Sequence, residues 1–229
     1  MRKCLVLLSG GQDSSTCLFW AKKKFRKVEA VSFDYGQRHR IELKSAAKIA
    51  KLAGVKQTII KIKEYETIRN SALTDRGIKV GKKHRLNRDL PSTFVPGRNI
   101  LFITVAASLA YTKRIKDLVI GVSQEDYSGY PDCREPFIRS MEKSLSLGMA
   151  RKFRIHAPLQ HKTKKDTVLL AKKLGVLRHM SHTHTCYRGT KKPCNTCPAC
   201  RLRARGFREA GLADLMLNPA DYKAGAGGK

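Results

Sequence analysis

The feature that most constrains the fold of this chain is a regular alternation of short apolar runs with amphipathic segments. The apolar runs have the length of buried strands and cover residues 4–8, 28–34, 57–62, 117–122 and 154–157. Helical patterns follow at residues 14–25, 41–53, 98–114, 135–147 and 163–174. This alternation predicts βαβ units, and therefore an α/β fold in which a parallel sheet carries helices on both faces.

Length and composition indicate a globular protein with a substantial core. The chain has 229 residues, of which 41% are hydrophobic and 28% charged. Its N-terminal apolar run is too short for a signal peptide, and no run approaches the roughly 18 apolar residues of a membrane span. We therefore expect a cytoplasmic protein that does not enter a membrane.

The charge is strongly positive, with 47 Lys and Arg against 18 Asp and Glu, a formal net charge of +29. Such a charge suits nucleic-acid binding. The basic residues are nevertheless spread along the chain, and many alternate with apolar positions at helical spacing, as in AAKIAKLAG at residues 46–54. We predict a generally basic surface without a dedicated nucleic-acid site, although the charge does not exclude one.

The first apolar run stops abruptly at the sequence SGGQDS, residues 9–14. Glycines let the backbone turn with exposed N–H groups, and a following helix adds its N-terminal dipole, which together form a phosphate cradle. A Gly-Gly pair alone also fits an ordinary strand-to-helix turn. The loop lacks the lysine of a Walker A loop, which favours a pyrophosphate that leaves as a unit, with Asp13 available to a Mg²⁺ ion.

All six positions of this loop match the pattern S-G-G-x-D-S and resemble the PP-loop of the N-type ATP pyrophosphatases. Those enzymes cleave ATP between its α- and β-phosphates, and their fold is of the adenine-nucleotide α-hydrolase type. The resemblance implies catalytic roles for Asp13 and Ser14. It also implies an ATP-binding segment made of Leu8, Ser9, Gly10, Gly11, Gln12, Asp13, Ser14, Ser15, Thr16, Cys17 and Leu18.

Four further motifs narrow the resemblance to one family. They are FDYGQRH at residues 33–39, VPGRN at 95–99, GYPDCR at 129–134 and TCY at 185–187. Together with the loop they resemble the 7-cyano-7-deazaguanine synthase (QueC) family over about residues 5–210. The resemblance implies a C–N bond-forming ligase of queuosine biosynthesis that uses ATP, free ammonia and 7-carboxy-7-deazaguanine as substrates. It implies acyl-adenylate and amide intermediates, release of AMP and pyrophosphate, and a possible homodimer.

The same motifs suggest where a substrate binds. The sequence FDYGQRH places polar groups after the second strand, beside the phosphate loop if the two strands are neighbours, although it also fits a left-handed turn around Gly36. Arg98, beside Asn99 near a helix cap, suits a catalytic clamp on a carboxylate or phosphate. The carboxylates of Asp126 and Asp132 can accept hydrogen bonds from the N–H groups of a purine-like base, and a tyrosine can stack on its ring. The predicted substrate-binding residues are Gln37, Arg38, Arg98, Asp126, Tyr130 and Asp132.

The C-terminal part contains four closely spaced cysteines, which are Cys186, Cys194, Cys197 and Cys200. Four thiolates complete a tetrahedral zinc site and leave no position open for a substrate. An iron–sulfur cluster also accepts four thiolates, and buried cysteines without metal are a third interpretation. We predict one structural Zn²⁺ per chain, with His182 and His184 as reserve ligands. The resemblance implies the same four zinc ligands.

We divide the chain into a nucleotide-binding α/β domain at residues 1–178, a zinc-binding segment at 179–214 and a flexible tail at 215–229. We expect a long loop at about residues 73–97, and loops of this length are usually functional or mobile. A basic helix is expected at about residues 198–210. Two other functions remain open: a PP-loop thiolase or ligase that modifies tRNA, and a non-catalytic zinc protein that binds nucleic acid.

Overall fold

The computed structural model describes residues 2–67, 70–124 and 129–216. The strands are β1 (Lys3–Leu7), β2 (Lys27–Asp34), β3 (Lys56–Lys61), β4 (Asp117–Val119) and β5 (Arg154–His156). The α-helices are α1 (Gln12–Lys24), α2 (Ile41–Ala53), α3 (Arg98–Thr112), α4 (Glu135–Gly148), α5 (Lys164–Lys173) and α6 (Pro198–Glu209). Three short 3-10 helices are η1 (Lys63–Glu66), η2 (Pro131–Cys133) and η3 (Leu177–His182). The predicted alternation of strands and helices is confirmed.

The strands form one parallel sheet in the order β3-β2-β1-β4-β5. The chain moves outward from β1 to β3, and then returns to place β4 on the other side of β1. The connections reverse direction at this point, and the loops leaving β1 and β4 diverge there. Open parallel sheets bind ligands at such a point, outside the carboxyl ends of the strands.

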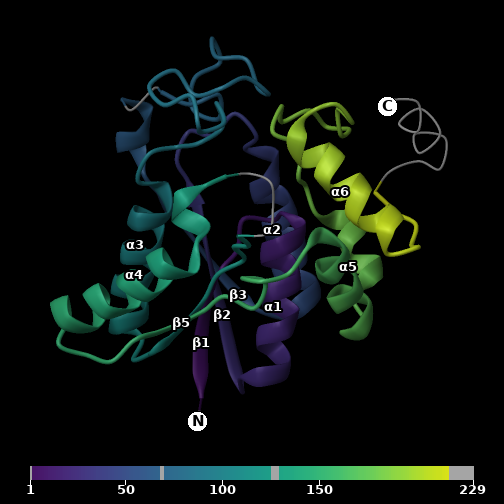
Figure 1. The fold of residues 1–229 in the computed structure, drawn as a ribbon. Helices are drawn as coiled ribbons and strands as arrows, with labels where there is room; N and C mark the ends of the chain where they lie inside the picture. Colours follow the sequence, from purple (N-terminus) through teal and green to yellow (C-terminus); the bar gives the residue numbers. More distant parts are fainter. Residues whose placement is uncertain (1, 68–69, 125–128, 217–229) are drawn as a thin grey trace.

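Helices cover both faces of the sheet, as predicted (Figure 1). In β1, Leu5 and Leu7 pack into one hydrophobic cluster, whereas Cys4 and Val6 pack into a second one on the opposite face. The first cluster includes residues of α3 and α4, and the second includes residues of α1, α2 and α5. Because β1 is buried on both faces, its sequence is continuously apolar instead of alternating.

Local sequence signals explain where several helices begin and end. Helix α5 begins with a capping box, in which Thr163 and Asp166 satisfy each other's backbone N–H groups. Helix α2 ends at Gly54, which adopts the left-handed conformation of a C-terminal glycine. Helix α1 begins at Gln12, two residues before the predicted start. Its cap residue, Gly11, makes no side-chain hydrogen bond, so no capping side chain marks this start in the sequence.

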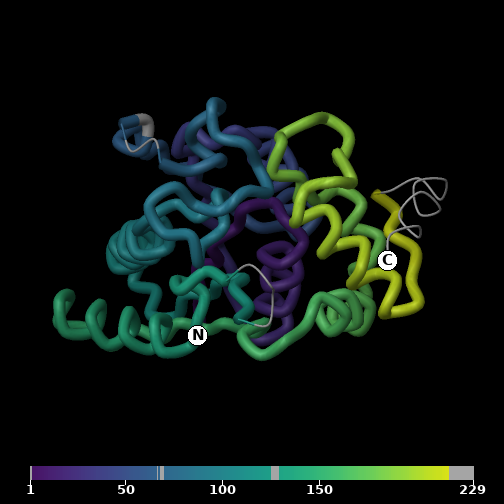
Figure 2. Tube along the Cα trace, turned by 45° about the horizontal axis from the view of Figure 1, so that its top comes forward, coloured from purple at the N-terminus to yellow at the C-terminus, as the bar shows by residue number. Residues whose placement is uncertain are grey.

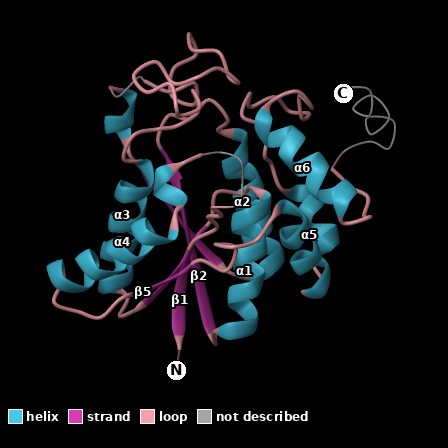
Figure 3. Ribbon diagram, viewed as in Figure 1, coloured by secondary structure: helices cyan, strands magenta, loops and turns pink. Residues whose placement is uncertain are grey.

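Long loops gather beyond the carboxyl ends of the strands, where Figure 3 shows pink segments above the sheet. The segment after η1 and the cysteine-rich segment before α6 both lie at this end (Figure 2). The predicted domain boundary at residue 178 falls inside η3, and Phe207 of α6 is buried in the same cluster as α5. Among the described residues, no helix has the length and apolar character needed to cross a bilayer.

Candidate active site

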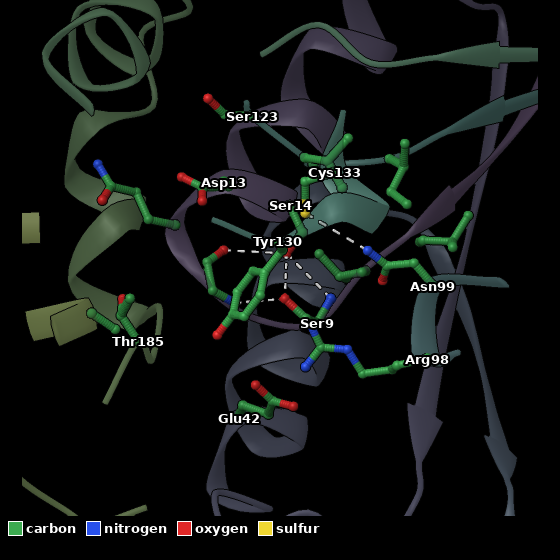
Figure 4. Close-up of a pocket in the computed structure, with 18 of the residues that line it drawn as sticks. Ser9, Asp13, Ser14, Glu42, Arg98, Asn99, Ser123, Tyr130, Cys133 and Thr185 are labelled. Carbon is green, nitrogen blue, oxygen red and sulfur yellow. Dashed lines mark hydrogen bonds between the residues drawn. The ribbon is translucent and has the colours of Figure 1, made fainter. Parts of the chain in front are cut away.

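A pocket of about 260 Å³ lies at the carboxyl ends of β1, β2 and β4. The phosphate loop forms its floor, and α2, α3 and the segment after η3 form its walls (Figure 4). Among the lining residues are Leu8, Ser9, Gly11, Gln12, Asp13, Ser14, Tyr35, His39, Glu42, Arg98, Asn99, Ser123, Tyr130, Lys164, His184, Thr185 and Tyr187. The pocket therefore occupies the position at which the strand order predicts a ligand.

Two serine hydroxyl groups organise the phosphate loop. The Ser9 and Ser14 hydroxyl oxygens are 2.9 Å apart, and the backbone N–H groups of Ser9 and Gly11 donate to Ser14 Oγ and Ser9 Oγ. The end of β4 approaches this loop closely, since a Cβ on Gly121 would lie 2.7 Å from the nitrogen of Ser14. Only a glycine at position 121 allows this approach, so β4 and α1 together shape the floor of the pocket.

Several polar atoms in the loop are buried and have no hydrogen-bond partner within the described chain. They are both amide atoms of Gln12 and Oδ1 of Asp13. The other carboxylate oxygen of Asp13 accepts a hydrogen bond from Lys164 Nζ at 2.5 Å. A buried polar group without a partner costs free energy, so such groups mark a site that a polar ligand completes. These donors and acceptors fit the phosphates of a nucleotide with its Mg²⁺.

Arg98 is half-buried at the start of α3, and its guanidinium is directed into the pocket (Figure 4). Burial alone would lower the pKa of Arg98, but Tyr35, Tyr130 and Asp132 surround it and raise the pKa above its ordinary value. For Tyr35, burial disfavours the charged phenolate and raises the pKa to about 12. The pocket therefore holds a permanent cation beside neutral phenols, which suits the recognition of an anion.

The four cysteines predicted to bind metal come together at the N-terminal end of α6. Their sulfur atoms all lie within 4.8 Å of one another. Backbone N–H groups of Cys194 and Cys197 donate to the sulfurs of Cys186 and Cys194. Such N–H groups stabilise thiolates and hold them in place around a cation. The arrangement is a candidate metal centre, and its sulfur donors suit zinc or an iron–sulfur cluster.

The segment that joins this centre to η3 also lines the pocket. Within it, the backbone N–H of His184 donates to the carbonyl of Gly10 at 2.9 Å, and Thr185 and Tyr187 line the pocket. His184 is buried, whereas His182 is exposed, and neither belongs to the group of four sulfurs. The candidate metal centre thus anchors one wall of the pocket.

Residues 3–211 match the model of the family described as "Queuosine biosynthesis protein QueC". The chain belongs to the QueC family. It is 51% identical to the 7-cyano-7-deazaguanine synthase of Chromobacterium violaceum, over 97% of this chain and 96% of that protein. It is also 50% identical to the synthase of that name from Laribacter hongkongensis, over 93% of each.

Solved structures of lower identity share the fold. One is a predicted subunit of tRNA methyltransferase from Methanocaldococcus jannaschii, with a TM-score of 0.51 and 20% identity over 76% of each chain. Another is the U34-tRNA thiolase NcsA from Methanococcus maripaludis with its [4Fe-4S] cluster, with a TM-score of 0.50 and 16% identity. That alignment covers 97% of this chain and 69% of the thiolase. These likenesses support the α/β fold of this QueC chain.

The structure brings only part of the predicted ATP-binding segment to the pocket. Leu8, Ser9, Gly11, Gln12, Asp13 and Ser14 line it, whereas Gly10 and residues 15–18 do not. Ser15, Thr16, Cys17 and Leu18 are buried inside α1, where Thr16 Oγ1 donates to the Gln12 carbonyl and Leu18 joins the hydrophobic core. The reason is the helical turn itself, which rotates these side chains away from the carboxyl end of β1.

Two of the predicted substrate-binding residues, Gln37 and Arg38, are turned away from the pocket. The Gln37 side chain bonds to the backbone of Phe33 and Tyr35, and Arg38 donates to the carbonyls of Asp75 and Ile78. Gln37 therefore supports the turn around Gly36, where φ is 73°. The structure thus agrees with the second interpretation of FDYGQRH, a left-handed turn around Gly36. Arg38 holds the loop that contains Asp75 and Ile78 and does not line the pocket.

Asp132 is also a predicted substrate-binding residue, but it is buried and does not line the pocket. Burial raises the pKa of Asp132 above its usual range, although Arg98 lowers it. Asn99 lies near the cap of α3 as expected, two residues after the cap residue Gly97, and its side-chain amide donates to the Asp132 carbonyl. Of the remaining predicted substrate residues, Arg98 and Tyr130 line the pocket, and Asp126 lies outside the described residues.

Sequence reasoning missed several residues of the pocket, among them Glu42, His39 and Lys164. His39 stands in the FDYGQRH motif, so its type and position were visible although its role was not. Glu42 and Lys164 lie in the first turns of amphipathic helices, where charged side chains are usually exposed to solvent. Only the packing of α2 and α5 against the phosphate loop distinguishes these two charges from surface charges.

Proposed function

We propose that this chain converts 7-carboxy-7-deazaguanine and ammonia into 7-cyano-7-deazaguanine at the expense of ATP. One observation carries the proposal: in a chain of the QueC family, the phosphate loop with its unpartnered polar atoms and the half-buried Arg98 face one pocket. A phosphate site and a carboxylate site side by side are what adenylation of a carboxylate requires.

The phosphate loop supports the first part of this chemistry. Backbone N–H groups at the start of α1 and the hydroxyls of Ser9 and Ser14 would hold the pyrophosphate part of ATP. Asp13, whose Oδ1 is buried and unpartnered, would hold a Mg²⁺ ion that neutralises phosphate charge. Catalysis of this kind depends on placement and charge stabilisation, and it needs no covalent nucleophile on the protein.

Arg98 and the aromatic side chains around it support the second part. The guanidinium suits the carboxylate of the substrate, which it can bind in bidentate fashion. Tyr35, Tyr130 and Tyr187 give the pocket flat apolar surfaces of the kind on which purine-like rings stack. The carboxylate would thus be held between Arg98 and the α-phosphate of ATP.

The reaction must remove both oxygens of a carboxylate, and each oxygen needs its own leaving group. Adenylation of the acid followed by ammonia gives the amide, and adenylation of the amide oxygen followed by loss of AMP gives the nitrile. We therefore expect two AMP and two pyrophosphates for each nitrile, and only one further ATP when the amide is supplied. Release of ADP and phosphate instead, or of one AMP per nitrile, would contradict the proposal.

Replacement of Arg98 tests the carboxylate clamp. Arg98→Gln should impair turnover of the acid more strongly than turnover of the neutral amide, because only the acid carries the charge that Arg98 binds. The measurement is kcat/KM for both substrates, with Arg139→Gln as a control because Arg139 pairs with Glu135 on the surface. Equal losses for acid and amide would refute the clamp.

For the candidate metal centre we propose one structural Zn²⁺, bound by Cys186, Cys194, Cys197 and Cys200. Four protein ligands complete a tetrahedral zinc site, which supports a structural role, and the ion would fasten the segment that forms one wall of the pocket. Metal analysis together with the visible spectrum tests this proposal, since an iron–sulfur cluster absorbs visible light and zinc does not. We also propose a cytoplasmic location, and homodimer formation remains a prediction.

A further inference from the structure

The proton balance of the proposed reaction requires a base in the pocket. The acyl adenylate and ammonium give the amide, AMP and two protons, as a C–N bond forms and the C–O bond to AMP breaks. The adenylated amide then gives the nitrile, AMP and two more protons. The nitrogen therefore enters with four N–H bonds and leaves with none, and every proton needs an acceptor near the reacting carbon.

Most titratable groups of the pocket are poorly placed to accept these protons. Asp13 is held by the Lys164 ammonium at 2.5 Å. The phenols remain protonated near neutral pH, because burial raises the pKa of Tyr35 to about 12 and raises that of Tyr130 and Tyr187 above the ordinary value. His184 is tied by its backbone to the phosphate loop and precedes the metal ligand Cys186 by two residues.

His39 and Glu42 lie in close ion-pair contact at the start of α2. The carboxylate oxygen Oε2 of Glu42 lies 3.1 Å from His39 Nε2, and Oε1 accepts a hydrogen bond from the Gln37 amide at 3.3 Å. A carboxylate at this distance favours the tautomer that carries its hydrogen on Nε2, and Nδ1 of the neutral ring then carries the lone pair. Glu42 thus selects one tautomer of the imidazole.

The lone pair of His39 has no donor in the described part of the chain. Nδ1 is buried and makes no hydrogen bond there, and the residues His39 and Glu42 are only 6% and 9% exposed. Both side chains line the pocket. A buried nitrogen of this kind loses free energy until a ligand donates to it, so its presence beside a substrate site points to an N–H donor as the missing partner.

We propose that His39, oriented by Glu42, is the catalytic base that removes protons from the substrate nitrogen. The inference rests on the proposed function. In each transfer an N–H bond breaks, its electron pair stays on nitrogen, and the proton binds Nδ1. The Glu42 carboxylate stabilises the resulting imidazolium, as the carboxylate of a catalytic triad does. Gln37 is a positioning residue, because it holds the carboxylate without facing the pocket.

The test separates adenylation from proton removal in the full-length protein with its metal. Exchange of labelled pyrophosphate into ATP, with 7-carboxy-7-deazaguanine and no ammonium, reports adenylation alone. His39→Gln and Glu42→Gln should retain this exchange, whereas nitrile formation at saturating ammonium should fall about 100-fold or more for His39→Gln, the usual size of a lost general base. A matched control is His156→Gln, since His156 pairs with Asp117 at 2.7 Å outside the pocket.

Hydroxylamine provides a second readout that a merely structural role would not produce. It is largely neutral near pH 7, so it attacks the acyl adenylate without prior loss of a proton. His39→Gln should therefore still form the hydroxamate at close to the wild-type rate. Equal loss of exchange, hydroxamate and nitrile would overturn the inference, and so would normal nitrile formation in the variant. A wild-type protein that neither exchanges nor forms AMP would instead refute the proposed function, and the inference with it.

Discussion

Replacing Gly10 by alanine should destabilise the whole domain, whereas replacing the neighbouring Gly11 should not. Gly10 has a φ of +88°, and a Cβ there would lie 2.2 Å from the carbonyl oxygen of Glu42 and 2.6 Å from the nitrogen of Ala46. Both atoms belong to the backbone of α2, so no side-chain rotation can relieve the contact. Helix α2 would have to move away from the phosphate loop, and Glu42 would move with it.

The size of the effect follows from two costs. The left-handed conformation costs an alanine roughly 1–2 kcal/mol relative to glycine, and overpacking of a close contact typically costs about 1–3 kcal/mol. The sum for Gly10→Ala is therefore about 2–5 kcal/mol. For a chain of this length, 1 kcal/mol shifts the melting temperature by roughly 2–4 °C, so a decrease of about 10 °C is expected.

Gly11 supplies the matched comparison. Its φ is −77°, and its nearest contact for a new Cβ is Ser9 Oγ at 3.4 Å. Gly11→Ala should cost roughly 1 kcal/mol or less, as expected for an N-cap glycine. It should nevertheless lower AMP formation, because the added methyl group obstructs the approach of a phosphate to the loop.

Thermal unfolding followed by circular dichroism, together with an assay for AMP, tests both expectations. We expect a Gly10→Ala protein of low stability and a folded Gly11→Ala protein that forms less AMP. A melting temperature for Gly10→Ala equal to that of the wild type would refute the packing argument. A fully active Gly11→Ala protein would refute the phosphate role of the loop.

Three further predictions concern the metal centre, the C-terminal segment and the core. Cys197→Ser should lower both metal content and melting temperature, whereas Cys133→Ser, which lies outside the four-sulfur group, should keep the metal. Asp214→Asn should cost about 3 kcal/mol in urea unfolding, because the buried guanidinium of Arg203 loses its carboxylate partner; unchanged stability would show that this ion pair is not needed. Burial raises the pKa of Cys4 to about 12, so the folded state holds this proton more tightly than the unfolded state. Its stabilising contribution is complete below pH 9 and is lost as the pH rises towards 12, so the free energy of unfolding should fall less steeply in Cys4→Ala over that range.

The sequence alone determined the features that depend on neighbouring residues. The order of strands and helices, the phosphate loop and the spacing of the four cysteines were all predictable, because periodicity and short spacings act over a few residues. The beginning of α1 was less predictable, since its cap is a glycine that makes no side-chain hydrogen bond.

Only the tertiary structure decided which charged side chains face the pocket. Asp13 and Lys164 are 151 positions apart, and the sequence contains no signal that pairs them. Within FDYGQRH, the sequence predicted Gln37 and Arg38 as substrate-binding residues, whereas the turn around Gly36 directs Gln37 inward and brings His39 to the pocket. A side chain's direction depends on the φ and ψ angles of one turn and on the element packed against it. Those contacts come from distant segments, and they form only when the chain folds.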